Sequence, residues 1–381
     1  MDSAEKPTKV SILWKMWRII LKIPLISILI LSGCLLNAAK TLEFYFIDVE
    51  EGSATLIVSP SGESLLVDTG SRGPDGRNVD RIIAATRSAG IQQIDYLLIT
   101  HYQDDHYGAA PELVQRLPVL HFLDHGPSIE AGKDAKWKQY WQIGTNDRLY
   151  AAYSAARARG KYTLVKPGDR LPIKGIEVLV LAAAGEKISA SLEGAGSPNT
   201  FCGSTGLRTE DRTEDGQSVG ILVTFGKFRF IHLGDLTWNR SLRLFCPNNP
   251  VGTVDVYLST HHGMSIAKET SEVRWGRSCC PEAEVYGLRP RVAILNCGEN
   301  YHRLGTPRAW QVIRNSPGLE DFWQMHYQAQ GGKDHNVPEQ FIANLSTRDC
   351  AGHPIKLSAE PNGGFSVTNT RNGLTRRYRP R

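Results

Sequence analysis

Two histidines and two aspartates lie within six residues of one another in the run His101-Tyr102-Gln103-Asp104-Asp105-His106. A mostly apolar run at residues 94–99 comes directly before it and predicts a buried strand. A loop that leaves the end of a strand can direct several side chains at one point. Neutral imidazole and carboxylate groups are ligands that suit zinc, manganese or iron. The sequence therefore predicts a metal site in this loop.

Further acidic and histidine side chains follow other predicted strands. Asp235 follows an apolar run at residues 228–233, and the pair His261-His262 follows another at residues 253–259. Asp68-Thr69-Gly70 ends a third such run. Each of these groups therefore sits at the end of a predicted strand, as the histidine loop does.

The elements that must position these side chains are read from periodicity and turn residues. Residues 184–217 lack periodicity and predict a long surface loop. Asn362-Gly363 and Asn372-Gly373 predict turns of C-terminal hairpins. Strands are predicted at residues 42–49, 54–58, 64–67, 94–99, 119–123, 176–181, 219–225, 228–233, 253–259 and 292–296, and helices at 78–89, 111–117 and within 130–160. Two mixed sheets that face each other, with helices outside, accommodate this order.

The order of these motifs resembles the metallo-β-lactamase fold superfamily. Within it, the chain is most similar to the branch related to the hydrolase domain of bacterial DNA-uptake competence proteins (ComEC-like). That branch has an Asp-Val-x-x-Gly pattern after its first strand, present as Asp48-Val49-Glu50-Glu51-Gly52, and a final loop present as His261-His262-Gly263. The resemblance implies an α/β, four-layer αββα sandwich over residues 41–316. A small C-terminal β appendage with hairpins is then expected over residues 317–381.

The resemblance also implies a set of metal ligands through the superfamily pattern His-x-His-x-Asp-His. The first metal is assigned to His101 and position 103, which is Gln103 here, and Asp235 bridges the two metals. The second metal is assigned to Asp105 and His106, with His262 completing it. Asp105 and His262 are also assigned to catalysis. His261 is expected beside the metal rather than on it.

Two departures from the family pattern affect the first metal. Gln103 replaces an imidazole with an amide, which is a weaker donor, and no histidine lies between residues 126 and 231 to serve as the third motif. Asp215 or Gln217 is expected to stand in for that histidine, and Asp104 adds a carboxylate beside the weakened position. The second set of ligands is intact.

The function that the resemblance implies is hydrolysis with one or two Zn²⁺ ions, or with Mn²⁺. Such a metal lowers the pKa of bound water from about 15.7 to near 7, and Asp105 would orient the resulting hydroxide. A phosphodiester or another small-molecule ester is the expected substrate, with nucleic acid as one source. The alternative is a degenerate surface protein that binds a metal or ligand without hydrolysing it.

Composition gives little support for binding nucleic acid by bulk charge. The chain has 381 residues and a formal charge of +5, with five basic and two acidic side chains in residues 1–33. Only +2 is left for the remainder, although a local basic patch is an open alternative. Nothing in the sequence indicates an oligomeric state.

The N-terminal residues 1–34 predict a targeting segment. A basic stretch runs to Lys22, an apolar stretch covers residues 23–31, and Leu31-Ser32-Gly33-Cys34 resembles the lipobox of bacterial lipoproteins. A cleaved signal ending near Ala38 or Ala39, or an uncleaved membrane anchor, are the alternatives. Each predicts an exported protein, either periplasmic or attached to the membrane as a lipoprotein.

Six cysteines follow Cys34, and an oxidising compartment permits them to form disulfides. The sequence does not determine how they pair. Cys279 and Cys280 are adjacent, so we expect each to pair elsewhere or to stay reduced rather than to pair with the other.

Overall fold

The side chains of strand β1 (Leu42–Phe46) alternate between two apolar cores in the computed structural model. Phe44 and Phe46 belong to the larger core between two sheets, whereas Tyr45 belongs to a second core beneath helices. The ring centroids of Phe44 and Phe230, which lie on facing sheets, are 4.8 Å apart. Because successive side chains of a strand point to opposite faces, one strand joins both cores.

The structure describes Met1 and residues 41–50, 52–141, 147–265, 276–298, 307–329, 332–346 and 350–381. Residues 41–381 form one unit. The predictions for the targeting segment fall on residues 1–40 and, Met1 aside, lie outside the described residues. Within the described part of the chain, no helix is both long and apolar enough to cross a membrane.

The first sheet is mixed. Its order is β18 (Thr375–Tyr378), β17 (Phe365–Asn369), β16 (Ile355–Ala359), β1, β2 (Thr55–Val58), β3 (Ser64–Val67), β4 (Ile94–Leu98), β5 (Val119–Asp124) and β6 (Lys161–Leu164). Pairing is antiparallel from β18 to β3 and parallel from β3 to β6. The parallel half therefore directs the carboxyl ends of β3, β4 and β5 to one edge.

The second sheet is mixed as well. Its order is β15 (Ile342–Asn344), β14 (Asp321–His326), β13 (Val292–Leu295), β12 (Val256–Leu258), β11 (Phe228–His232), β10 (Gly220–Phe225), β8 (Glu177–Ala183) and β7 (Arg170–Leu171), with β9 (Glu186–Lys187) paired to β8. Strands β11 to β15 are parallel. The loops after β11, β12 and β13 therefore leave from the same edge.

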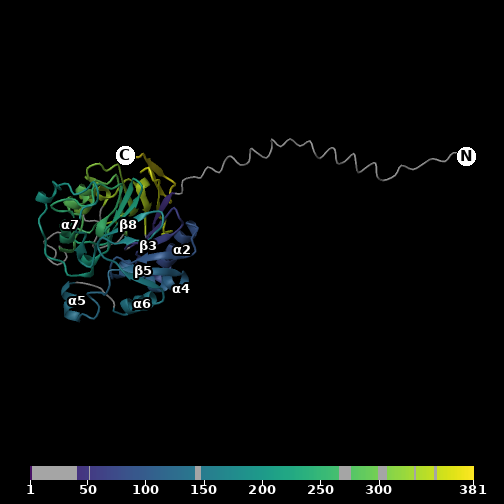
Figure 1. The fold of residues 1–381 in the computed structure, drawn as a ribbon, viewed down its shortest axis with the longest axis horizontal. Helices are drawn as coiled ribbons and strands as arrows, with labels where there is room; N and C mark the ends of the chain where they lie inside the picture. The colour runs from purple at the N-terminus through teal and green to yellow at the C-terminus, as the bar shows by residue number, and fades with distance from the viewer. Residues whose placement is uncertain are drawn as a thin grey trace. The chain divides into compact units, whose positions relative to one another are not determined.

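Helices cover the outer faces of the sheets. In Figure 1, α2, α4 and α6 lie near β3 and β5, and side chains of these three helices share the second core with the first sheet. The helices are α2 (Arg77–Ser88), α3 (Asp104–Tyr107), α4 (Ala110–Arg116), α5 (Ala135–Trp141), α6 (Asp147–Arg157), α7 (Trp238–Phe245), α9 (Glu282–Leu288) and α10 (Pro307–Arg314). Short 3₁₀ helices include η2 (Pro74–Gly76), η3 (Cys202–Ser204), η4 (Glu214–Gln217), η5 (Thr260–Gly263), η8 (Lys333–His335) and η9 (Glu339–Phe341).

The predicted architecture of two facing mixed sheets with helices outside is confirmed. The C-terminal hairpins are present, with turns at Asn362-Gly363 and Asn372-Gly373, but they extend the first sheet because β16 pairs with β1. Strands β14 and β15 extend the second sheet. Residues 317–381 thus contribute strands to both sheets rather than forming a separate appendage.

The prediction for the adjacent cysteines is wrong, because the structure joins Cys279 to Cys280. Cys280 has a φ of 61°, a left-handed conformation that brings the two adjacent side chains together. A second disulfide links Cys202 to Cys246, at the end of α7. Cys297 and Cys350 are thiols.

Candidate metal centre

The histidine loop is held in place by Asp68, which follows β3. Asp68 accepts hydrogen bonds from the backbone nitrogen of Thr100 at 2.7 Å and from its hydroxyl at 2.8 Å. Thr100 follows β4, so this contact ties together the ends of two neighbouring parallel strands. Helix α3 then begins at Asp104 and presents Asp105 and His106.

A glycine makes room for α3. Gly52 has a φ of 117°, and a Cβ atom added to it would lie 1.9 Å from the backbone oxygen of Asp105. The neighbouring Ser53 donates its backbone N–H to that oxygen at 3.1 Å. The glycine of the Asp-Val-x-x-Gly pattern therefore allows the loop after β1 to support the metal-binding loop.

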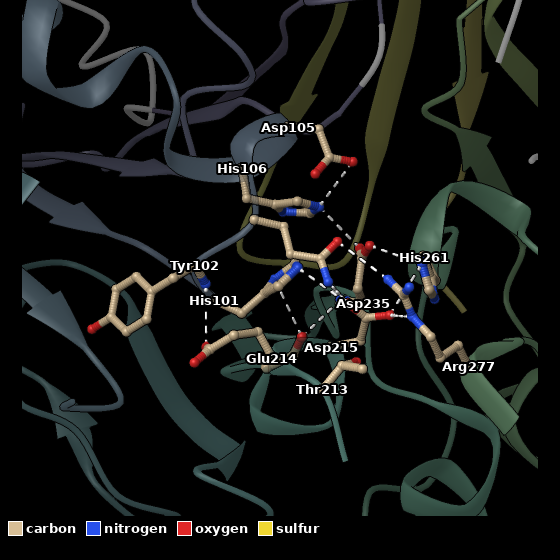
Figure 2. A network of polar contacts seen from close by, with 12 residues as sticks. His101, Tyr102, Asp105, His106, Thr213, Glu214, Asp215, Asp235, His261 and Arg277 are labelled. Atoms are coloured by element: carbon tan, nitrogen blue, oxygen red, sulfur yellow. Dashed lines mark hydrogen bonds and ion pairs between the residues drawn. The ribbon is translucent and has the colours of Figure 1, made fainter. Parts of the chain in front are cut away.

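Four of the predicted ligands converge on one point. The side-chain ligand atoms of Asp105, His106, Asp235 and His262 all lie within 4.8 Å of one another. The two imidazole Nε2 atoms are 3.0 Å apart. Asp235 Oδ1 lies 3.2 Å from His106 Nε2, and Asp235 Oδ2 lies 3.4 Å from His262 Nε2. Figure 2 shows Asp105, His106 and Asp235 directed at this position, which we call the second metal position.

Hydrogen bonds outside this cluster orient both imidazoles. Asp68 Oδ2 lies 2.7 Å from His106 Nδ1, and a carboxylate there holds the proton on Nδ1. The backbone oxygen of Asn296 lies 3.1 Å from His262 Nδ1 and can hold that proton in the same way. Nε2 is then the ligand atom of each ring. Two imidazoles and two carboxylates whose ligand atoms lie within 4.8 Å of one another are a set of donors that fits a divalent ion.

The cluster is strongly coupled in charge. Burial would lower the pKa of His106, but the carboxylates of Asp235 and Asp68 outweigh burial and raise the pKa well above its usual range. Burial would raise the pKa of Asp235, but the facing imidazoles, His106 foremost, lower that pKa well below its usual range. Burial likewise opposes the charge on His262, whose pKa Asp235 nevertheless raises. Nearby positive charge therefore stabilises the buried carboxylates, and a divalent ion can supply that charge.

The first metal position is built differently. His101 Nε2 is buried, has no hydrogen-bond partner among the described residues and lies 3.8 Å from Asp215 Oδ1. Burial and the nearby His106 lower the pKa of His101 well below its usual range, so the ring is neutral. Asp215 lies in η4, which precedes β10, and is one of the two residues expected to stand in for the third histidine.

Gln103 does not point at an open coordination site. Its amide nitrogen donates to Asp215 Oδ1, and its amide oxygen accepts from Arg277 Nη2 at 3.3 Å. Arg277 Nε also donates to Asp215 Oδ2 at 2.5 Å (Figure 2). A cationic side chain therefore lies among the residues of the first position, which do not fit a second divalent ion in this arrangement.

Two other histidines are placed by the structure. His261 Nε2 lies 3.2 Å from Asp235 Oδ2 and 3.7 Å from Asp215 Oδ2, beside the cluster as expected. His125 lies 3.0 Å from Glu214 Oε2 and packs against the Tyr102 ring with centroids 4.7 Å apart. It belongs to a separate network around Glu214.

Sequence reasoning missed Arg277 and Glu214. Glu214 accepts hydrogen bonds from the Ser128 hydroxyl at 2.7 Å and the Ile129 nitrogen at 2.6 Å. Glu214 lies within the residues predicted as a surface loop. No motif surrounds Arg277, and no local pattern could have indicated that it reaches Gln103, 174 positions earlier.

A further group of potential ligands, Asp48, His326 and Cys350, does not make a comparable site. Their ligand atoms lie within 4.8 Å of one another. However, Arg81 Nη1 lies 3.0 Å from Asp48 Oδ2 and already neutralises that carboxylate. We therefore interpret this group as a structural ion pair.

A family comparison identifies the fold. The model of the metallo-beta-lactamase superfamily matches residues 47–241, slightly more than half of the chain. The chain belongs to the metallo-β-lactamase superfamily. The match begins before the Asp-Val-x-x-Gly pattern and extends past Asp235, so it includes the histidine loop.

Individual relatives are distant. An atrochrysone carboxyl ACP thioesterase from Cryptosporiopsis sp. (strain 8999) is 34% identical over 70 residues, which is 18% of this chain and 21% of that protein. Among solved structures, the metallo-beta-lactamase fold protein YhfI from Bacillus subtilis is 11% identical with a TM-score of 0.43, covering 75% of this chain and 96% of that one. Zn(2+)-bound PqqB from Methylobacterium extorquens is 15% identical with a TM-score of 0.38, covering 65% and 76%.

Proposed function

We propose that this metallo-β-lactamase fold protein is an exported hydrolase that depends on a divalent ion, zinc or manganese, held by Asp105, His106, Asp235 and His262. The observation that carries the proposal is the convergence of these four side chains from three separate loops within 4.8 Å. The chemistry that such an ion supplies when bound is Lewis acidity, which acidifies water to a pKa near 7 and polarises the bond under attack.

The chain's own groups have distinct roles in this reaction. Asp105 Oδ2 lies 3.6 Å from His262 Nε2 and is the more exposed of the two carboxylates, with 18% of its side chain accessible. It is placed to accept the proton of an attacking water. Asp235 and His262 hold the centre, and Asp68 fixes the ring of His106.

The substrate that we propose is an ester-type bond, with a phosphodiester favoured. The Asp48-Val49-Glu50-Glu51-Gly52 and His261-His262-Gly263 patterns, which resemble the competence-related branch, support this choice. A thioester is the second candidate, and the 70-residue match to a thioesterase favours it. Nucleic acid is one source of phosphodiesters.

Export and lipid attachment at Cys34 are part of the proposal. The Leu31-Ser32-Gly33-Cys34 sequence supports them. The disulfide between Cys202 and Cys246 is consistent with an oxidising compartment, since such bonds persist mainly outside the cytoplasm. Detection of a diacylglyceryl group on Cys34 by mass spectrometry of the membrane fraction would test this part.

The experiment that tests the hydrolase uses full-length protein purified without chelator. Its metal content is measured by inductively coupled plasma mass spectrometry, and hydrolysis of bis(p-nitrophenyl) phosphate, an aryl thioester and a lactam is compared. We expect phosphodiester cleavage that His106→Ala reduces by at least about 100-fold. The control is His335→Ala, a histidine of η8 outside the site. Metal-loaded protein that cleaves none of these substrates above the His106→Ala background would favour the non-catalytic alternative.

A further inference from the structure

Asp215 is one of the two residues that we expect to stand in for the third histidine of the superfamily pattern. It is fully buried and lies in η4, which precedes β10. Its Oδ1 atom lies 3.8 Å from His101 Nε2 and accepts a hydrogen bond from Gln103. The three residues at the first metal position therefore do converge, despite the two substitutions.

The guanidinium of Arg277 is hydrogen bonded to two of these three residues. Arg277 is 5% exposed, and its Nε and Nη2 atoms donate to Asp215 and to Gln103 at 2.5 and 3.3 Å. An arginine side chain stays protonated in proteins, so this group is a cation. Both non-histidine groups of the first position are thereby hydrogen bonded to one fixed cation, as Figure 2 shows for Arg277 and Asp215.

His261 lies between Asp215, the partner of this cation, and Asp235 of the second metal position. Its Nε2 atom lies 3.7 Å from Asp215 Oδ2 and 3.2 Å from Asp235 Oδ2. Asp235 is the residue that bridges two metals in the superfamily pattern. Here its Oδ1 atom lies 3.2 Å from His106 Nε2, and its Oδ2 atom lies near both His262 Nε2 and His261 Nε2.

We propose that the side chain of Arg277 replaces the first metal ion, so that this protein binds a single divalent ion, at the second position. The inference rests on the proposed function, because it presumes that the second position binds metal. The substitutions at positions 103 and 215 then belong together: an amide and a carboxylate suit a guanidinium, whereas imidazoles suit a metal. A divalent ion beside the buried guanidinium is excluded by charge repulsion.

The test restores the metal ligands. Native mass spectrometry counts zinc ions per chain in the full-length protein, in Arg277→Lys, and in the triple variant Gln103→His/Asp215→His/Arg277→Ala. We expect one ion in the wild type and in Arg277→Lys, which keeps the positive charge. The triple variant, with His101 as its third imidazole, should gain a second ion. It removes both partners of the ion pair, which avoids leaving Asp215 buried without its cation.

A second substitution separates the two positions. Adding His106→Ala should lower the count from one to zero in the wild type and from two to one in the triple variant. Far-ultraviolet circular dichroism and thermal melting establish that each variant is folded. Two ions in the wild type, or one in a folded triple variant, would overturn the role of Arg277 while leaving the hydrolase proposal intact. No metal in any folded variant would overturn both.

Discussion

Asp68 contacts both the loop that carries the ligands and one ligand directly, His106. It adopts a left-handed conformation with a φ of 60°, which is unusual for a residue other than glycine. In this conformation one oxygen accepts from the Thr100 nitrogen, and the other accepts from the Thr100 hydroxyl and faces His106 Nδ1. Backbone strain at Asp68 thus accompanies the orientation of a metal ligand.

We expect Asp68→Asn to weaken metal binding by roughly 10–100-fold, because an amide cannot hold the proton on His106 Nδ1 as a carboxylate does. Zinc affinity measured by competition with a chromophoric chelator checks this. Asp80→Asn is the matched control, since Asp80 lies on α2 with 60% of its side chain exposed. Equal affinity in the two variants would show that Asp68 does not orient the ligand.

A second residue-scale prediction concerns His326 and pH. His326 Nε2 lies 2.7 Å from Asp48 Oδ1, with Arg81 and Cys350 also against Asp48. Burial opposes the charge on His326, but the hydrogen bond to Asp48 raises its pKa to about 9 from 6.5. A raised pKa contributes stability that is complete below pH 6.5 and is lost as the pH rises through 9.

The expected contribution is up to about 3 kcal/mol, at about 1.36 kcal/mol per pH unit. Urea unfolding of the wild type and of His326→Gln at several values of pH from 6 to 10 measures it. The difference between the two proteins isolates His326 from other titrating groups. We expect this difference to shrink toward high pH, and a difference that stays constant would contradict the pKa shift.

At the scale of elements, the site depends on contacts between the loop after β1 and helix α3. Gly52 is where these two segments approach most closely, and α3 carries two of the four ligands of the second position. A methyl group at Gly52 would displace the backbone of Asp105. The glycine of the Asp-Val-x-x-Gly pattern therefore supports the proposed metal site by packing against the backbone of Asp105, not as a ligand.

Gly52→Ala should lower the free energy of unfolding by more than about 2 kcal/mol and weaken zinc binding as well. Gly62→Ala is its matched control: Gly62 has a φ of 91°, but nothing lies within 4 Å of the added Cβ. In Gly62→Ala the added methyl group meets no neighbour, so only the unfavourable positive φ lowers the free energy of unfolding. Urea unfolding and zinc titration of both variants make the comparison, and identical results would exclude the steric role of Gly52.

At the scale of the whole molecule, the first sheet draws strands from the two ends of the described chain, whereas the second sheet is built from residues 170–344. The backbone oxygen of Pro361, in the turn between β16 and β17, accepts from the Lys227 nitrogen in the β10–β11 turn at 2.8 Å. The first sheet is therefore completed by C-terminal strands, and its turn contacts the second sheet. The proposed metal ligands follow β4, β11 and β12.

The Cys202–Cys246 disulfide ties the long segment before β10 to α7 across a sequence separation of 44. Closing a loop of that length restricts the unfolded chain, so Cys202→Ser/Cys246→Ser should lower the free energy of unfolding by about 4 kcal/mol. Urea unfolding under non-reducing conditions checks the value. Cys350→Ser, which alters a thiol outside any disulfide, is the control. A double variant as stable as the wild type would show that the disulfide does not form in solution.

Local pattern was sufficient for much of the fold. The third strand was predicted with its observed bounds, Ser64–Val67, because an apolar run there is bounded by turn residues. Helix α7 and strands β14 and β15 were not predicted. Helix α7 is amphipathic, so its sequence did carry a helical pattern. Strands β14 and β15 depend on pairing with other segments, since β14 pairs with β13 and β15.

The sequence alone determined which side chains could hold a metal, because each ligand follows a recognisable strand end and the motif order is local information. It did not reveal that Arg277 contacts the residues of the first metal position. Arg277 lies 174 residues from Gln103 and 62 residues from Asp215 in the sequence. The residues next to each of these three positions do not indicate that they meet. Only folding removes these groups from water. Because a buried carboxylate without a partner is energetically costly, it is paired with a cation. Arg277 is the cation that pairs with Asp215, and only the tertiary structure shows this pairing.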